Sequence, residues 1–242
     1  MELFIEHGLQ PEIGLEGDVL YTRSREDFQR LAATLQRHNL SCTLHAPFFD
    51  LAPGGLDPKI RQVSREKLAL AFELIPIFKP RQVICHLNYE DDKHRFKQEQ
   101  WFTHARQTWQ ELLTVAQTHQ TPLLLENTYE KNPEQHLRML HELDSPLAGF
   151  CFDTGHVLAF SGNTWQDWLP PMLPWLKHLH LHDNKGGLDS HLAVGQGCFD
   201  FQGVFDYLSQ QGVSPTVTLE PHKPEDLWVS LEALREMGVL GV

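Results

Sequence analysis

The stretch AGFCFDTGH, residues 148–156, shows most directly how this chain folds. Its first five residues are apolar or small, which is typical of a strand that is buried on both faces of a sheet. The run ends at Asp153, and Thr-Gly-His follows at once. A buried strand with polar residues at its carboxyl end indicates a parallel sheet that carries its chemistry at that end.

Six more short apolar runs share this length and composition. They are Pro11–Glu16, Cys42–Ala46, Gln82–His86, Pro122–Asn127, Lys177–Asp183 and Thr216–Glu220. Amphipathic stretches lie between the runs, and several begin with a capping residue such as Ser24 or Asp57. The helices expected from them are Arg25–His38, residues 58–78, Arg95–His119, a helix opened by Asn132-Pro133, Thr164–Leu173, Phe199–Gln211 and Pro224–Met237.

Regular alternation of strands and helices predicts an α/β fold with parallel strands and right-handed crossovers. At 242 residues, the chain has the length of one TIM-type (β/α)8 barrel, so we expect a single domain over residues 1–242. A doubly wound open sheet is the second choice. Residues 3–7 read either as a strand or as a helix that ends at Gly8. We favour the helix, which leaves the barrel incomplete at its first strand.

The composition argues against several classes of protein. Lys and Arg number 20 and Asp and Glu 32, so the net charge of −12 would repel a nucleic-acid backbone. The four cysteines are scattered and form no CxxC pair, which predicts reduced thiols. No basic, apolar leader opens the chain, and no apolar run approaches the roughly 20 residues that cross a bilayer. We therefore expect a soluble, cytoplasmic protein without a membrane or nucleic-acid partner.

Polar side chains stand at the carboxyl ends of nearly all the predicted strands. In a parallel barrel these ends meet at one mouth. Carboxylates and imidazoles that converge there would repel or desolvate one another unless a cation neutralises them. The sequence therefore predicts a metal site, with candidate ligands His45, His86, Glu126, Asp153, His156, His180 and Glu220.

The loop after the strand Lys177–Asp183 adds two further candidates. It carries Asp189-x-His191, which could bind a ligand or hydrogen-bond internally, and then Gly195-x-Gly197. These glycines would let the backbone approach a ligand closely. The motif is too short to indicate a dinucleotide site, because no strand leads into it.

The remaining histidines receive other expectations. His178 lies deepest in its strand and is expected in the core, whereas His182 is either a partner of the metal ligands or a substrate contact. The histidines on or near predicted helices are expected at the surface; they are His7, His38, His94, His104, His119, His136 and His141.

The ordered motifs resemble those of the xylose-isomerase-like TIM barrels. That superfamily includes sugar isomerases and epimerases and the endonuclease IV-type metal-dependent hydrolases. The matching segments are HAPF (45–48), His86, LEN (125–127), DTGH (153–156), HLHD (180–183), DSHLAVGQG (189–197) and Glu220. They extend over nearly the whole chain in the family's order.

The resemblance implies two sets of ligands. In the isomerase branch, one divalent metal is held by residues matching Glu126, Asp153, His180 and Glu220. In the endonuclease IV-like branch, three metals are held by nine residues. All nine have counterparts here: His45, His86 and Glu126; Glu126, Asp153, His180 and Glu220; and His156, Asp189 and His191. This mixed nitrogen and oxygen set suits Zn²⁺, with Mn²⁺ or Fe²⁺ as alternatives.

We first expect a metal-dependent phosphoesterase with a small phosphorylated substrate. The loops FFDLAPGGLDP (48–58) and VLAFSGNT (157–164) contain no basic residue, which together with the net charge argues against DNA repair. Up to three metal ions would bind per chain, and a metal-bound water would supply the hydroxide that acts as the nucleophile. Glu126, Glu220 and His180 are the expected catalytic residues.

Two alternatives remain open from the sequence. In a ketose isomerase or epimerase, one metal would polarise a carbonyl, and Glu126 and Glu220 would transfer protons at the adjacent carbon. The other five residues, His45, His86, His156, Asp189 and His191, would then contact substrate. The third reading is a binding protein that keeps the fold without turnover, since fold alone does not decide activity.

Overall fold

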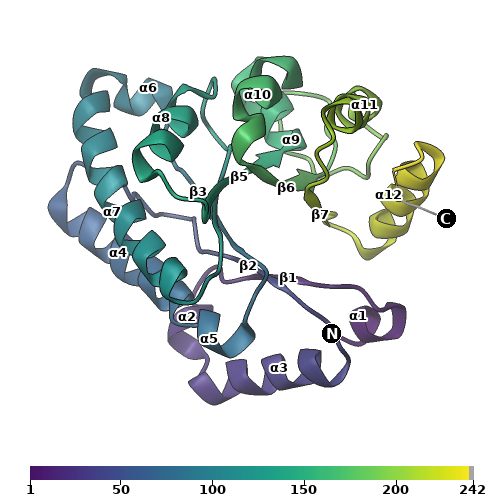
Figure 1. The fold of residues 1–242 in the computed structure, drawn as a ribbon, viewed down its shortest axis with the longest axis horizontal. Coiled ribbons are helices and arrows are strands. Elements are labelled where there is room, and N and C mark those ends of the chain that lie inside the picture. The colour runs from purple at the N-terminus through teal and green to yellow at the C-terminus, as the bar shows by residue number, and fades with distance from the viewer. Residues whose placement is uncertain (240–242) are drawn as a thin grey trace. The chain divides into compact units, whose positions relative to one another are not determined.

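The computed structural model describes residues 1–239, in which seven short parallel strands alternate with helices (Figure 1). The order of the strands in the sheet follows their order in the sequence. They are β1 (Glu12–Gly14), β2 (Thr43–His45), β3 (Val83–His86), β4 (Leu123–Glu126), β5 (Ala148–Asp153), β6 (Leu176–Leu181) and β7 (Thr216–Leu219). Each overlaps a run expected to form a strand, and the TIM-type α/β fold is confirmed.

Helices connect the strands. They are α1 (Glu2–His7), α2 (Val19–Thr22), α3 (Arg25–Arg37), α4 (Pro58–Phe72), α5 (Ile75–Phe78), α6 (Asp91–His94), α7 (Gln98–Thr118), α8 (Glu134–Leu143), α9 (Thr154–His156), α10 (Trp165–Met172), α11 (Phe201–Gln211) and α12 (Pro224–Glu236). Shorter turns of other helix types are η1 (Arg95–Lys97), η2 (Val157–Ser161) and η3 (Leu173–Trp175). Within residues 1–239, no helix is both long and apolar enough to cross a membrane.

The N-terminal segment forms a helix, as favoured from the sequence. Gly8 follows α1 in the left-handed conformation, with φ 63°, and the backbone turns there to satisfy the last carbonyls. The segment expected as one helix over residues 58–78 is instead two, α4 and α5. Pro76 lies in the first turn of α5, where its ring and missing N–H are tolerated, whereas neither would fit inside a continuous helix.

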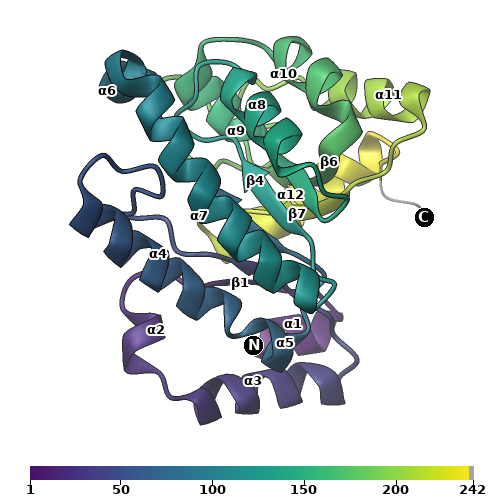
Figure 2. The same ribbon diagram turned by 60° about the vertical axis from the view of Figure 1, so that its left-hand side comes forward.

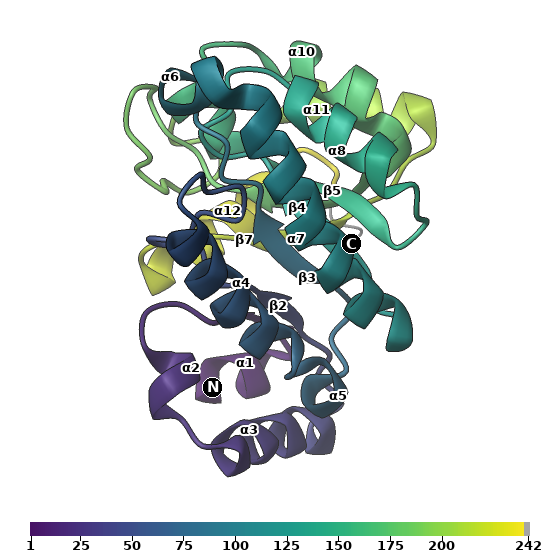
Figure 3. The same cartoon turned by 90° about the vertical axis from the view of Figure 1, so that its left-hand side faces the viewer.

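The chain divides into two compact units, of which the first comprises Met1–Asn88, Asp92–Leu125 and Arg138–Gly149. In this unit β2 pairs in parallel with both β1 and β3. Helices α4 and α7 lie side by side (Figure 2), as do α3 and α5 (Figure 3). The side chains of Trp101 and Trp109 on α7 are fully buried.

The second unit comprises Tyr89–Asp91, Glu126–Leu137 and the chain from Phe150 onward. Here β6 pairs in parallel with β5 and with β7. The register sets Asp153 beside His180, and Glu220 directly follows the last pair of β6 and β7. Three candidate ligands therefore stand at the ends of neighbouring strands.

The single domain expected over residues 1–242 stays a prediction.

Candidate active site

Seven of the nine residues predicted as ligands belong to the second unit. They lie at strand ends or on the segments that follow those ends. Glu126 ends β4, Asp153 ends β5, His156 is in α9, His180 is next to the last residue of β6, Asp189 and His191 are on the loop after β6, and Glu220 follows β7.

Asp153 is held in place from two directions. It is the N-cap of α9, and its Oδ1 accepts the backbone N–H of His156 at 2.7 Å. The Asn127 side chain joins it to the end of β4: Asn127 Nδ2 donates to the Asp153 carbonyl (2.9 Å), and the Asp153 N–H donates to Asn127 Oδ1 (2.8 Å). The LEN and DTGH motifs are thus parts of one hydrogen-bonded structure.

The first donor set is centred on His180, whose side chain is fully buried. Its Nδ1 lies 3.0 Å from Glu220 Oε1, 3.3 Å from Glu126 Oε1 and 3.8 Å from Asp153 Oδ2. Glu126 and Asp153 are buried as well, whereas Glu220 keeps part of its side chain exposed. Three carboxylates and one imidazole therefore converge on one place.

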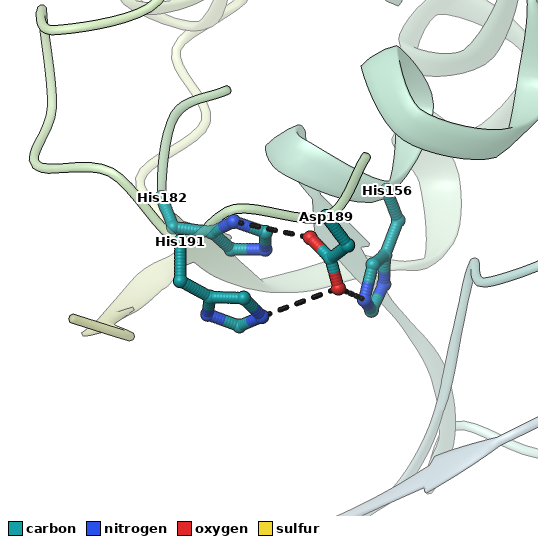
Figure 4. A group of neighbouring side chains, drawn as sticks. All are labelled: His156, His182, Asp189 and His191. Carbon is teal, nitrogen blue, oxygen red and sulfur yellow. Dashed lines mark hydrogen bonds and ion pairs between the residues drawn. The ribbon is translucent and has the colours of Figure 1, made fainter. Parts of the chain in front are cut away.

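The second donor set surrounds Asp189 with three imidazoles (Figure 4). Asp189 Oδ2 lies 3.4 Å from His156 Nε2 and 3.2 Å from His191 Nε2, and Oδ1 lies 3.6 Å from His182 Nδ1. His191 Nδ1 also donates to the Glu220 backbone carbonyl at 2.8 Å, which ties the loop to the end of β7.

The titration behaviour reflects this crowding of charge. Burial alone would raise the pKa of Asp189, but hydrogen bonds from His156 and His191 hold that pKa well below its usual range. Burial alone would lower the pKa of His156, yet the carboxylates of Asp153, Asp189 and Glu126 raise it well above its usual value. The raised pKa values of His156 and His191 favour protonated imidazoles beside these carboxylates, and a divalent cation held here would replace those protons.

These donors fit a divalent metal. Three carboxylates that lie within 4 Å of one imidazole nitrogen favour a compensating cation, and oxygen-rich sets with one or more imidazoles suit Zn²⁺, Mn²⁺ and Fe²⁺. The His180-centred set consists of the four residues that the isomerase branch implies. Cys151, which also lies near Glu126 and His180, is a buried cysteine on β5.

His45 and His86 belong to the first unit, at the ends of β2 and β3. Their rings meet edge to face with centroids 5.1 Å apart, and Phe48 stacks on His86 at 3.9 Å. Glu16 holds this turn, since its Oε1 accepts the Phe48 N–H at 2.7 Å. The predicted place of the two histidines beside Glu126 around a metal stays a prediction.

His136 was expected at the surface and is instead fully buried, and His94 is buried too. His136 Nε2 donates to the Glu126 carbonyl at 3.0 Å, and its ring packs against Phe150 and Trp168. Burial lowers its pKa to about 4, so the ring is neutral. The sequence held a signal for this, because His136 shares helical spacing with the buried residues Met139, Leu140 and Leu143.

The Gly195-x-Gly197 motif binds a carboxylate of the chain itself. Asp183, buried after β6, accepts backbone N–H groups from Gly195 (3.2 Å) and Gly197 (2.8 Å). A Cβ at Gly197 would clash with the Asp183 carboxylate and the Asn184 carbonyl. The glycines do allow a close approach to the backbone, but the group that approaches is the Asp183 carboxylate, which holds the loop in place.

Comparisons with known proteins extend over nearly the whole chain. An uncharacterized protein of Methanocaldococcus jannaschii is 26% identical over 98% of this chain and 83% of its own length. A crystal structure of a D-tagatose 3-epimerase-like protein is 25% identical with a TM-score of 0.87, covering 98% of this chain and 91% of that one. A protein from Thermus thermophilus, soaked with ZnCl2, is 24% identical with a TM-score of 0.83 and the same coverage of both chains.

These comparisons show that the phosphoester hydrolase reading is wrong. The finding that overturns it is the similarity to the D-tagatose 3-epimerase-like protein, whose name refers to sugar epimerisation and not to phosphoester hydrolysis. The hydrolase reading rested on the presence of all nine donors. Glu126, Asp153, His180 and Glu220 are implied in both branches, so the donor types alone do not separate hydrolysis from proton transfer.

The strand order, the donors at the strand ends and the similar structures all agree with one family. Its model, described as the xylose isomerase-like TIM barrel, matches residues 3–237. The chain belongs to the xylose isomerase-like TIM barrel family.

Proposed function

We propose that this protein is a divalent-metal-dependent isomerase or epimerase of a small ketose. The observation that carries the proposal is that Glu126 and Glu220 both contact the same buried nitrogen, His180 Nδ1, at 3.3 and 3.0 Å. Two carboxylates that face one point can act as a general base and a general acid, one taking a proton from a carbon and the other returning a proton to it. The similarity to a D-tagatose 3-epimerase-like protein supports this reading.

The metal would be held by Glu126, Asp153, His180 and Glu220. When bound, it supplies a Lewis acid that polarises the ketose carbonyl and its neighbouring hydroxyl. Zn²⁺ is our first expectation, with Mn²⁺ or Fe²⁺ as alternatives, and this reaction needs one ion per chain.

The two glutamates would then divide the proton transfer. One carboxylate starts ionised and takes the proton from the carbon next to the carbonyl, and the C–H electron pair moves into an enediolate. The other starts protonated and delivers its proton to the opposite face of the same carbon, which gives the epimer. An aldose forms instead when the proton is taken from the terminal carbon C1 and returned to the former carbonyl carbon C2, while the hydroxyl proton on O1 passes to O2.

The second donor set would contact sugar hydroxyls. Asp189 accepts hydrogen bonds, and His156 and His191 can donate or accept them, so together they suit a chain of hydroxyl groups. The hydrogen bond from the His191 side chain to the Glu220 carbonyl would keep these contacts aligned with the proton-transferring carboxylate.

The test is solvent deuterium exchange. Metal-free protein is reloaded with Mn²⁺ or Zn²⁺ and incubated in D₂O with free and phosphorylated ketopentoses and ketohexoses. Proton NMR should show deuterium at the carbon next to the carbonyl, together with the epimer or the aldose. The free and phosphorylated arms separate the two substrate types.

Glu126→Gln and Glu220→Gln should each lower kcat by roughly 10²–10⁴-fold, because each removes one proton-transferring group while keeping its size. Glu236→Gln, on the exposed side of α12, is the matched control and should leave kcat unchanged. Unaltered turnover in either site variant would exclude the proposed roles. No exchange with any ketose in the metal-loaded wild type would exclude the reaction.

A further inference from the structure

His182 is a member of the second donor set that also contacts the first set, and it is not among the nine ligands predicted from the sequence. It is the first residue after β6, and its side chain is buried. Nε2 lies 3.1 Å from Asp153 Oδ2 and 3.0 Å from Asp153 Oδ1, so this N–H donates to the carboxylate. Nδ1 of the same ring faces Asp189 Oδ1 at 3.6 Å.

The ring also packs against the loop that carries Asp189 and His191. His182 and His191 stack face to face, with centroids 3.8 Å apart and planes within 1° (Figure 4). His156 meets the His182 ring edge-on, with centroids 5.6 Å apart. One imidazole thus touches a ligand of the first set and three members of the second.

The local backbone is built to accommodate this ring. Gly155, in α9, lies directly against it, and a Cβ at that position would clash with the imidazole. The flanking backbone is fixed as well: Asn184 Nδ2 donates to the Gly155 carbonyl (2.8 Å), and Thr154 Oγ1 donates to the His182 carbonyl (2.9 Å). The glycine of DTGH is therefore explained by the second histidine of HLHD.

We propose that His182 is a positioning residue that orients Asp153 for metal binding and fastens the Asp189–His191 loop to it. A hydrogen bond to a ligating carboxylate fixes which oxygen faces the metal, and its loss weakens metal binding. Asp153 Oδ1 already accepts the His156 N–H, so His182 supplies the second restraint on this carboxylate. The stack on His191 carries the same restraint to the loop.

His178, two residues before His180 on β6, shows what a purely structural histidine looks like here. Its two nitrogens bond the hydroxyls of Thr216 and Thr218 on β7, at 2.6 and 2.8 Å. These are neutral contacts within the sheet, whereas His182 contacts two carboxylates. The buried His178 ring therefore links two strands, whereas the buried His182 ring links two carboxylates.

The inference rests on the metal site of the proposed function and is tested without any sugar. Metal-free protein is titrated with Mn²⁺ alone by calorimetry. His182→Phe keeps the stack on His191 but loses the bond to Asp153, so we expect Mn²⁺ affinity to fall by roughly 10–100-fold. His182→Gln retains a donor that can reach Asp153 and should recover most of that loss.

Gly155→Ala tests the same contact with His182 unchanged, and it should also weaken Mn²⁺ binding. Adding Gly155→Ala to His182→Ala should cause little further loss, because the ring that the new methyl group displaces is already absent. The matched control is His94→Phe, in a buried histidine that packs against Trp101, and it should bind Mn²⁺ as wild type does. Thermal unfolding with a chelator present checks that each variant folds.

Wild-type Mn²⁺ affinity in folded His182→Phe would overturn the inference, and so would an equal loss in His182→Gln. A wild type that binds no Mn²⁺ or Zn²⁺ would overturn it together with the metal site. The proposed reaction is judged separately, because weaker Mn²⁺ binding in His182→Phe beside a wild type inactive on every ketose would retain this inference and reject the reaction.

Discussion

Glu130 is a buried carboxyl group that joins two loops of the second unit. Its Oε1 accepts the Tyr89 N–H at 3.0 Å, and its Oε2 accepts the Thr128 N–H at 2.7 Å. Burial raises the pKa of Glu130 to about 7, even though both N–H groups favour the charged form. The folded protein thus holds a proton on this group at pH values where the unfolded chain has lost it.

This pKa predicts a pH dependence of stability. Between the ordinary value of 4.5 and about 7, the folded state binds more protons than the unfolded state, so the free energy of unfolding falls as the pH rises. The loss should reach about 3 kcal/mol above pH 7, at roughly 1.4 kcal/mol per pKa unit. Glu130→Gln, which cannot ionise, should lack this decline.

Urea unfolding of the wild type and Glu130→Gln at several pH values between 4.5 and 8 measures the difference. A matched control is Glu134→Gln, on the first turn of α8. The same pH slope in the wild type and in Glu130→Gln would contradict the prediction.

At the scale of elements, the connection after β6 depends on a single carboxylate. Asp183 accepts the N–H groups of Asn184, Cys198 and Phe199 as well as those of the two glycines. Five backbone N–H groups around one buried carboxylate hold residues 195–199 against the end of β6. Asp183 and Leu192 also exchange backbone hydrogen bonds, at 2.8 and 2.7 Å.

Asp183→Asn should therefore destabilise the protein by about 2–3 kcal/mol, because an amide group replaces a charged acceptor and turns donors toward donors. Unfolding by urea measures the loss. Asp206→Asn is the control: Asp206 lies on α11, is exposed, and contacts Gln202. A loss no greater than that of the control would show that the loop does not depend on the charge of Asp183.

At the scale of the whole molecule, metal binding should raise the thermal stability. A ligand that binds only the folded state at 100 times its Kd adds about 2.7 kcal/mol to the free energy of unfolding. For a chain of this size, that corresponds to an increase in Tm of roughly 5–10 °C. Calorimetry with Mn²⁺ or Zn²⁺, and again after chelation, should show this increase and its reversal.

Elemental analysis of the same samples counts the ions. One ion per chain is expected if only the His180-centred set binds metal. Three ions per chain would mean that His156, Asp189 and His191 bind metal and not sugar. Glu220→Gln should reduce the stabilisation by metal, and an unchanged metal-dependent Tm in that variant would remove Glu220 from the ligands.

Apolar runs and helix caps predicted the strands and most of the helices, and the polar residues at the ends of the runs predicted where the candidate ligands stand. All seven strands were predicted, because a buried strand needs a short apolar run and its polar end residue is visible locally. The start of α3 at Ser24, with its capping box to Asp27, and the end of α1 at Gly8 were also predictable, because both depend on neighbouring residues in the sequence. The family followed from the order of the motifs, since each motif belongs to one strand end.

Which side chains meet became visible only in the folded chain. That His182 lies between Asp153 and Asp189, that Gly155 makes room for it, and that Asp183 binds Gly195 and Gly197 all depend on how β5, β6 and their loops pair in space. His136 is buried because α8 turns it toward the Glu126 carbonyl. The hydrolase prediction was wrong for a different reason: both branches use residues matching Glu126, Asp153, His180 and Glu220, so the residue types alone do not distinguish the two reactions.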